Sequence, residues 1–235
     1  MKKFNLKPQR AFVFYFVILS LVLFVGCQQD IVAPKNTGFL QEKYSDSTST
    51  EFLQEICNEL NFARTNPSKY ATDVLELHLA SFESDGVTYK DSAGLRIRTI
   101  EGKSAVQEAI DELKGCSAIG KLTLDEGLSK ASELLASYQV RTKTTGHNGP
   151  NGMNMRARIE KFGKWSGYIG ENCAYGPKTP REIVAQLIID DGVSKCGHRQ
   201  NIFNSTYKIV GIAYHEGGSY GSVCVMDFAG GFTSY

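Results

Sequence analysis

The chain lacks an excess of charge of either sign. Its 26 Lys and Arg residues stand against 25 Asp and Glu residues, which gives a formal net charge of +1 at pH 7. Nucleic acids and acidic membranes attract proteins through a surplus of basic side chains. The composition therefore argues against nucleic acid, or an acidic membrane, as the main partner, and the sequence names no protein partner.

Several motifs of hydrolases and metal-binding domains are also absent. No His-Glu-x-x-His sequence occurs, which excludes the common zinc-protease motif. No Cys-x-x-Cys sequence occurs, which excludes a zinc knuckle and a thioredoxin-like redox site. Ser166 lacks the flanking glycines of a nucleophile elbow, so it does not indicate an esterase-type serine.

The apolar run near the start is too short to cross a membrane comfortably. It covers residues 11–25, and four cations precede it: Lys2, Lys3, Lys7 and Arg10. A basic start, a short apolar run and a small residue before a polar stretch are typical of a secretory signal. Cys27 at the break indicates a bacterial lipoprotein signal in which this cysteine is lipidated, although Phe24 occupies the position usually filled by Leu.

We therefore expect an exported protein, either a cell-envelope lipoprotein anchored to a membrane by its lipidated N-terminus or an extracellular protein. A retained membrane anchor is the remaining alternative. Residues 28–50 are rich in Gln, Ser, Thr, Asp and Lys, so they cannot bury enough apolar surface to offset their ordering entropy. The predicted organisation is a signal peptide with the lipidated cysteine over residues 1–27, a flexible tether over 28–50 and one domain over 51–235.

Five cysteines remain after Cys27, an odd number that leaves at least one thiol free in any pairing. An exported protein can form disulfides, but the spacing does not determine which cysteines pair. We interpret them as structural or buried residues and leave the pairing open among Cys57, Cys116, Cys173, Cys196 and Cys224.

Hydrophobic periodicity predicts helices over residues 51–64, 67–79, 104–115, 125–140, 153–162 and 180–191. Capping boxes are predicted at Ser104-x-x-Gln107 and at Thr179-Pro180-Arg181-Glu182. Alternating runs predict a small hairpin over 87–100, an extended segment over 167–175 and a C-terminal hairpin from 207–215 and 222–228. Helices followed by strands in this order predict an α+β fold around a small sheet.

The candidate functional residues lie between residues 146 and 199. His147 and His198 each follow a glycine, and Glu171 and the pair Asp190-Asp191 lie between them. Imidazoles and carboxylates bind divalent metals or transfer protons near neutral pH. Each residue type also has a structural alternative: the histidines could bond to backbone carbonyls at glycine turns, Glu171 could cap a helix, and the two aspartates could face water. Acidic side chains at a helix C-terminus oppose the macrodipole, however, so at least one of the two aspartates should have a partner.

Several motifs together resemble the CAP superfamily, which includes the cysteine-rich secretory proteins, antigen 5 and the pathogenesis-related proteins. They are Ala63-Arg64-Thr65-Asn66-Pro67, Gly146-His147, Gly170-Glu171-Asn172, Asp190-Asp191-Gly192 and Gly197-His198-Arg199. The resemblance covers residues 51–235. It implies an α-β-α sandwich with a central antiparallel sheet flanked by helices. It also implies a cleft lined by His147, Glu171, Asp190 and His198, with Asp191 as the alternative second acid.

The ligand types of these four residues predict a metal site in which His147 and His198 bind Zn²⁺ or another divalent ion and the carboxylates hold metal-bound water. We favour a binding module for a lipid, a sterol or another envelope component. The alternative is a metal-dependent peptide or ester hydrolase that uses the same four residues, and a third reading is an interaction domain with a vestigial site. Cys173 can be imagined as a nucleophile with His198, but burial is the favoured interpretation.

Overall fold

The computed structural model describes residues 49–235, so the predicted signal peptide, Cys27 and nearly all of the predicted tether lie outside the described residues. Within this range, no helix is both long enough and apolar enough to cross a membrane. The five cysteines of the range are all free thiols, so none of the pairings left open above is formed.

The elements follow one another in a helical, then strand-rich order. They are α1 (Thr50–Thr65), α2 (Pro67–Tyr70), the π-helical turn η1 (Ala71–Leu75), α3 (Glu76–Ala80), β1 (Thr88–Lys90), β2 (Arg96–Arg98), α4 (Lys103–Gly115), β3 (Thr123–Leu124), α5 (Glu126–Thr142), the 3-10 turn η2 (Pro150–Gly152), α6 (Met155–Ile159), β4 (Gly163–Tyr175), α7 (Pro180–Ile189), the 3-10 turn η3 (Ser194–Cys196), α8 (Gly197–Ile202), β5 (Ile209–Glu216) and β6 (Ser222–Ser234).

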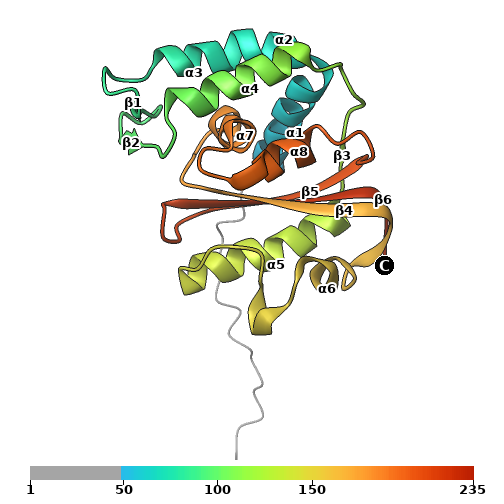
Figure 1. The fold of residues 1–235 in the computed structure, drawn as a ribbon. Helices are drawn as coiled ribbons and strands as arrows, with labels where there is room; N and C mark the ends of the chain where they lie inside the picture. The colour runs from blue at the N-terminus through green and yellow to red at the C-terminus, as the bar shows by residue number, and fades with distance from the viewer. Residues whose placement is uncertain (1–48) are drawn as a thin grey trace, which may run out of the picture. The chain divides into compact units, whose positions relative to one another are not determined.

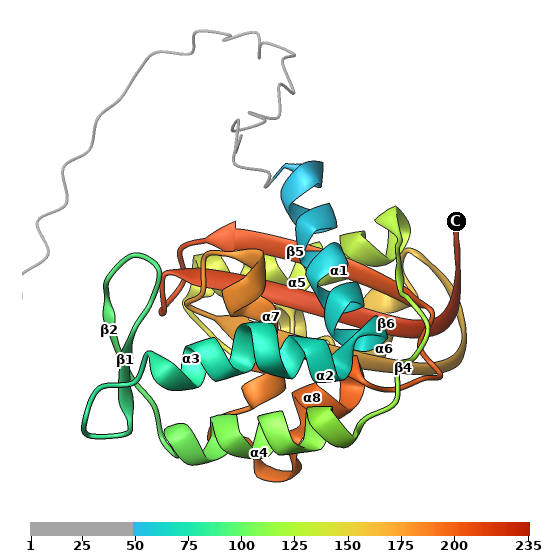
Figure 2. The ribbon, with the colours of Figure 1, turned by 90° about the horizontal axis from the view of Figure 1, so that it is seen from above.

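The main sheet has the strand order β3-β5-β6-β4, so β4 is an edge strand. Strand β6 pairs with both β4 and β5 in antiparallel fashion, whereas β3 pairs with β5 in parallel over two residues. Helices α1 to α4, α7 and α8 cover one face of this sheet, and α5 and α6 cover the other (Figure 1). Figure 2 shows the first helical layer from above, with the strands running beneath it. The expected α+β sandwich is confirmed.

Alternate residues of β5 and β6 pack against opposite helical layers. Val210 and Ile212 belong to the large core that includes α1, α4 and α7, whereas Ala213 and Val225 pack against α5. Helix α5 lies so close to β5 that a Cβ added at Gly211 would lie 2.3 Å from the backbone of α5. Both faces of the sheet are therefore buried, and a charged side chain on either face needs an internal partner.

The two predicted capping boxes have different outcomes. Thr179 caps α7, because its hydroxyl accepts from the Glu182 backbone N–H and donates to the Glu182 carboxylate. The box at Ser104 is wrong: this residue lies inside α4, and Gly102 is the N-cap. The backbone N–H groups that precede α4 instead donate to the carboxylate of Asp191, from a distant part of the chain.

Two other helical predictions need correction. The helix predicted over 153–162 is reduced to α6, which begins at Met155 because the Asn154 side chain accepts from the Ala157 N–H. The helix predicted over 67–79 is present but contains the π-helical turn η1. The sequence patterns did not predict α8, which carries His198. The extended segment predicted over 167–175 begins earlier, at Gly163.

Arg64, near the end of α1, is fully buried and connects distant segments of the first layer. Its guanidinium donates to the backbone carbonyls of Gly120, Ile202, Asn204 and Tyr207. Burial lowers the pKa of Arg64 to about 10. These contacts attach α1 to the chain that leaves α8, and thereby fix the end of the helix that carries His198.

Replacing Arg64 by Met should destabilise the fold by about 3 kcal/mol or more. The reason is that four buried carbonyls lose their donor, and each unsatisfied buried group costs about 1–3 kcal/mol. Urea unfolding at pH 7 measures the effect. Arg181→Met is the matched control, because Arg181 is 61% exposed and pairs with Glu59 at the surface, and it should cost less than about 1 kcal/mol. Equal losses in the two variants would contradict the assignment of Arg64.

Candidate metal site

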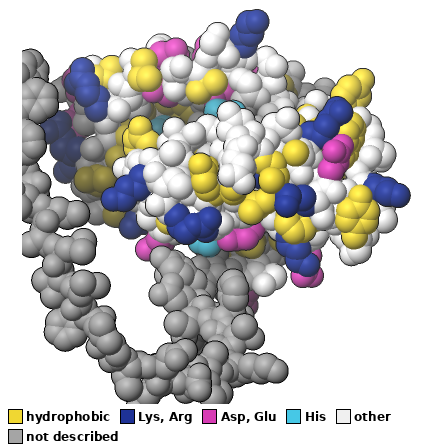
Figure 3. Space-filling view, turned by 90° about the horizontal axis from the view of Figure 1, so that it is seen from below, with side chains coloured by type: hydrophobic (Ala, Val, Ile, Leu, Met, Phe, Trp, Pro, Cys, Tyr) yellow, Lys and Arg dark blue, Asp and Glu magenta, His cyan; other side chains and the backbone are white. Residues whose placement is uncertain are grey.

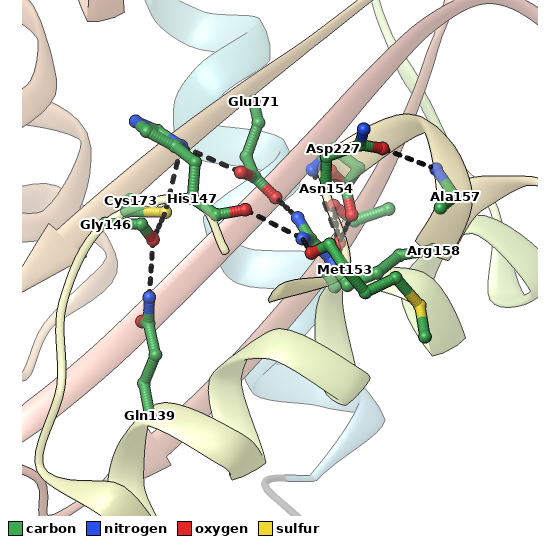
Figure 4. A network of polar contacts seen from close by, with 12 residues as sticks. Gln139, Gly146, His147, Met153, Asn154, Ala157, Arg158, Glu171, Cys173 and Asp227 are labelled. Atoms are coloured by element: carbon green, nitrogen blue, oxygen red, sulfur yellow. Dashed lines mark hydrogen bonds and ion pairs between the residues drawn. The ribbon is translucent and has the colours of Figure 1, made fainter. Parts of the chain in front are cut away.

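The first histidine and carboxylate pair joins the loop after α5 to β4. Gly146, with φ of +97°, turns this loop so that His147 reaches the strand. His147 Nδ1 lies 2.7 Å from Glu171 Oε1. The His147 side chain is 57% exposed and that of Glu171 only 3%, so a buried carboxylate holds an imidazole that remains open to solvent (Figure 4). The hydrogen bond from Glu171 raises the pKa of His147 above its ordinary value, and burial opposes this rise.

Arg158, which the sequence analysis did not select, is the internal partner of Glu171. Its side chain is fully buried, and its Nη2 contacts Glu171 Oε2. Its Nη1 donates to the backbone carbonyls of His147 at 2.8 Å and Met153 at 3.1 Å. One guanidinium therefore fixes both the carboxylate and the loop that carries the imidazole. No local pattern marks this residue, because its partners lie in two other segments of the chain.

Asp227 is a second buried carboxyl behind Glu171, and the two residues are register partners in β4 and β6. Ser132 Oγ lies 2.8 Å from Asp227 Oδ2, and no donor of the described chain reaches Oδ1. Burial raises the pKa of Asp227 well above its ordinary value; the charge of Glu171 adds to this rise, and Arg158 opposes it. The buried position beside Glu171 therefore favours the neutral form of the Asp227 carboxyl.

The second pair lies between α7 and α8. Asp190, the C-cap of α7, has φ of +61° and a fully buried side chain. Its Oδ1 lies 2.6 Å from His198 Nδ1, and its Oδ2 accepts from the backbone N–H groups of His198 and Arg199 at 2.9 and 3.2 Å. Asp191 instead binds the backbone before α4, so Asp190 is the acid that contacts His198. Both aspartates thus have partners, whereas the unfavourable position of an acid at a helix C-terminus predicted a partner for at least one of them.

Two amide side chains connect the second pair to the first. Asn172 Nδ2 donates to the His198 carbonyl at 3.0 Å. Asn201 Nδ2 donates to Asn172 Oδ1 at 2.8 Å and to the Glu171 carbonyl at 3.3 Å. Helix α8 is therefore attached to the same part of edge strand β4 that holds His147.

The two histidines share one arrangement. Each uses Nδ1 to contact a buried carboxylate, and within residues 49–235 neither Nε2 atom has a hydrogen-bond partner. A carboxylate on one ring nitrogen fixes the ring and makes the other nitrogen a better metal ligand. The donor chemistry of His147 and His198 therefore fits a divalent metal.

Cys173 offers a different grouping, because its ligand atom lies within 4.8 Å of ligand atoms of both His147 and Glu171. Its Sγ is 3.8 Å from His147 Nδ1. The histidine beside Cys173 is therefore His147 and not His198, the partner considered in the sequence analysis. The residue is buried, as expected, and burial raises the pKa of its thiol well above the ordinary value, with a further rise from Glu171. A protonated thiol is a poor nucleophile, so the position of Cys173 does not favour the nucleophile interpretation.

Comparison with known proteins gives one family and a few relatives. The family model described as "CAP: Cysteine-rich secretory protein family" matches residues 107–228. The uncharacterized protein YkwD of Bacillus subtilis (strain 168) is 29% identical over 120 residues, which are 49% of this chain and 45% of that protein. The chain thus covers less than half of this curated relative.

Two solved structures are also similar. One is an extracellular protein containing an SCP domain from Bacillus anthracis, with 14% identity, a TM-score of 0.38, and coverage of 54% of this chain and 37% of that one. The other is an outer surface protein of Borrelia burgdorferi, with 18% identity, a TM-score of 0.36, and coverage of 56% of this chain and 96% of that one.

Asp227→Asn should remove a pH-dependent loss of stability. Between its ordinary pKa of 3.8 and the raised value, Asp227 binds more proton in the folded than in the unfolded chain. Wild-type stability should therefore fall with rising pH in this window, by up to about 1.4 kcal/mol per pH unit relative to the amide variant. Urea unfolding of both proteins from pH 4 to pH 8 measures this difference.

Asp73→Asn, at an exposed position beside Lys69, is the matched control. Its difference from wild type should stay nearly constant over the same pH range, because solvent screens the charge of an exposed side chain. A flat difference for Asp227→Asn over the same range would show that Asp227 is charged in the folded protein.

Proposed function

As the chain belongs to the cysteine-rich secretory protein family, we propose that it is an exported envelope protein whose two carboxylate-held histidines bind a divalent metal ion, with zinc as the first candidate. His147 and His198 hold the ion through Nε2, while Glu171 and Asp190 orient the rings. A bound ion supplies a Lewis acid with open coordination positions for a ligand. The matched arrangement of the two imidazoles carries this proposal.

The hydrogen-bond contacts of the two carboxylates, Glu171 and Asp190, support ligand binding rather than hydrolysis. Glu171 uses one oxygen for His147 and the other for Arg158. Asp190 uses one oxygen for the His198 ring and the other for two backbone N–H groups. A general base needs a free oxygen within reach of the proton it removes. Both acids are already engaged, so the metal-dependent hydrolase is the weaker alternative.

The ligand that we propose is a lipid, a sterol or another envelope component. An open surface hollow lies between α3 and α4; it is lined by Leu79 and Ala80 and by the polar side chains of Glu76, Lys103, Ser104 and Gln107. Its polar lining does not by itself identify an apolar ligand. The hollow does not include His147 or His198 among its lining residues, so an apolar ligand there would be separate from the metal.

Zinc titration by calorimetry tests the metal site. His147→Ala and His198→Ala should each weaken zinc binding strongly, by about tenfold or more, because each removes one of two nitrogen ligands. His215→Ala is the control, since His215 contacts Glu133 outside the site. Unchanged binding in His198→Ala would rule out the proposed site.

Zinc binding should also weaken as the pH falls. A protonated imidazole cannot bind a metal, and the raised pKa of His147 lets protons compete at a higher pH than its ordinary value of 6.5 implies. Affinity should therefore still rise as the pH increases through 6.5 and be lost below it. An affinity that is constant from pH 5.5 to pH 8 would contradict ligation by His147.

The choice between binding and hydrolysis needs two further measurements. Mass spectrometry of the purified protein, with and without zinc, should find a co-purifying lipid if the chain is a binding module. Turnover of a peptide and ester library that disappears in Glu171→Ala, but persists in the control Glu133→Ala, would instead establish the hydrolase.

A further inference from the structure

The loop that carries His147 is exposed along most of its length. It follows α5, and residues 141–145, His147 and Asn148 are exposed, whereas Gly146 is half-buried. Histidine side chains are visible on the face formed by α5 and α6 (Figure 3). Water can satisfy the backbone groups of an exposed loop, so such a loop needs no side-chain partner for its N–H and C=O groups.

Gly146 nevertheless has side-chain partners for both of its backbone polar groups. Its N–H donates to the Tyr175 hydroxyl at 2.8 Å. Its carbonyl accepts from Nε2 of Gln139, a fully buried residue of α5 (Figure 4). The Tyr175 hydroxyl donates to Gln139 Oε1 at 3.3 Å and closes a ring of three hydrogen bonds. We call the side chains of Gln139 and Tyr175 the Gly146 clamp.

The donors and acceptors of the Gly146 clamp match in one arrangement only. The Tyr175 oxygen accepts from the Gly146 N–H, so its own hydrogen is available to Gln139 Oε1. The amide nitrogen of Gln139 then faces the Gly146 carbonyl, and a flipped amide would place two oxygens against each other. A buried glutamine is unfavourable unless its amide is bonded. Both polar atoms of this amide are used to hold the loop.

Strand β4 reaches the loop at two points. Glu171 contacts the His147 ring, and Tyr175, four residues further along, contacts Gly146. Side chains an even number of positions apart in a strand share a face, so the carboxylate and the hydroxyl project from the same side of the sheet. From α6, Arg158 donates to the His147 carbonyl. The peptide groups on both sides of the His147 Cα are therefore held by side chains.

We propose that Gln139 and Tyr175 are positioning residues for the metal ligand His147. The peptide group between Gly146 and His147 sets the direction in which the imidazole leaves the backbone. A clamp on this peptide keeps Nδ1 at Glu171 and leaves Nε2 available to a metal. Ordering the ring in advance lowers the entropy cost of binding. The inference rests on the proposed metal function, because the Gly146 clamp acts on one of the two metal ligands.

The end of α5 does not need the clamp. The Gln139 backbone carbonyl already accepts from the backbone N–H groups of Lys143 and Thr144, and Lys143 has the left-handed conformation that is common where helices end. Removing the Tyr175 hydroxyl should therefore leave the end of α5 in place and release the peptide between Gly146 and His147.

Two conservative variants test the clamp. Tyr175→Phe removes only the hydroxyl, and Gln139→Met keeps the length of the side chain but removes both polar atoms. Each should weaken zinc binding about threefold to tenfold in calorimetry, the factor that corresponds to one ordinary hydrogen bond. Tyr70→Phe is the matched control, because it removes a buried hydroxyl on α2, in the other helical layer, and should leave the zinc affinity unchanged.

A second measurement needs no metal. The contact with Glu171 holds the neutral His147 ring in the form protonated at Nδ1, and proton–nitrogen NMR of the zinc-free protein at about pH 8.5 distinguishes this form from the one protonated at Nε2. Both clamp variants should shift the His147 signals toward the second form. The His198 signals should stay unchanged, because Asp190 holds that ring. Ile110→Val, a substitution in the core of α4, lowers stability without touching the loop and should change neither histidine.

Unchanged His147 signals in both clamp variants would overturn the inference. An equal loss of zinc affinity in Ile110→Val would also overturn it, because the effect would then follow from stability alone. A wild-type protein that binds no zinc, together with altered His147 signals in Tyr175→Phe, would refute the proposed metal function but would support the positioning of the imidazole by the clamp.

Discussion

The rest of the site depends on how a charged Glu171 is kept inside the sheet. A carboxylate at this depth is unfavourable unless a cation and hydrogen bonds compensate it. Arg158 supplies the cation, and its Nη1 donates to the backbone of the loop that carries His147. One buried guanidinium lies beside both Glu171 and Asp227, and burial together with the charge of Glu171 raises the pKa of Asp227. The buried Glu171 needs a cation, and Arg158, which meets this need, also fixes the position of the exposed His147 ring.

The alternation of β4 explains how one strand serves both histidines. Neighbouring side chains of a strand point to opposite faces. Glu171 contacts His147 on the α5 side, whereas Asn172 donates to the His198 carbonyl and belongs with α8. Because β4 is an edge strand, neither contact has to pass another strand. Each helical layer therefore contacts this edge strand through the segment that carries one of the two histidines.

Local signals predicted much of the fold, and distant contacts account for the errors. The N-cap at Thr179 was predicted correctly because Thr179 and Glu182, which bond to each other, lie within one turn. The box at Ser104 failed because Asp191 accepts from the backbone groups before α4 from another segment. The histidines and acids could be selected by residue type and by resemblance. Arg158 and Asp227 could not, because an arginine in a short helix and an aspartate in a strand have no pattern that reveals a common partner.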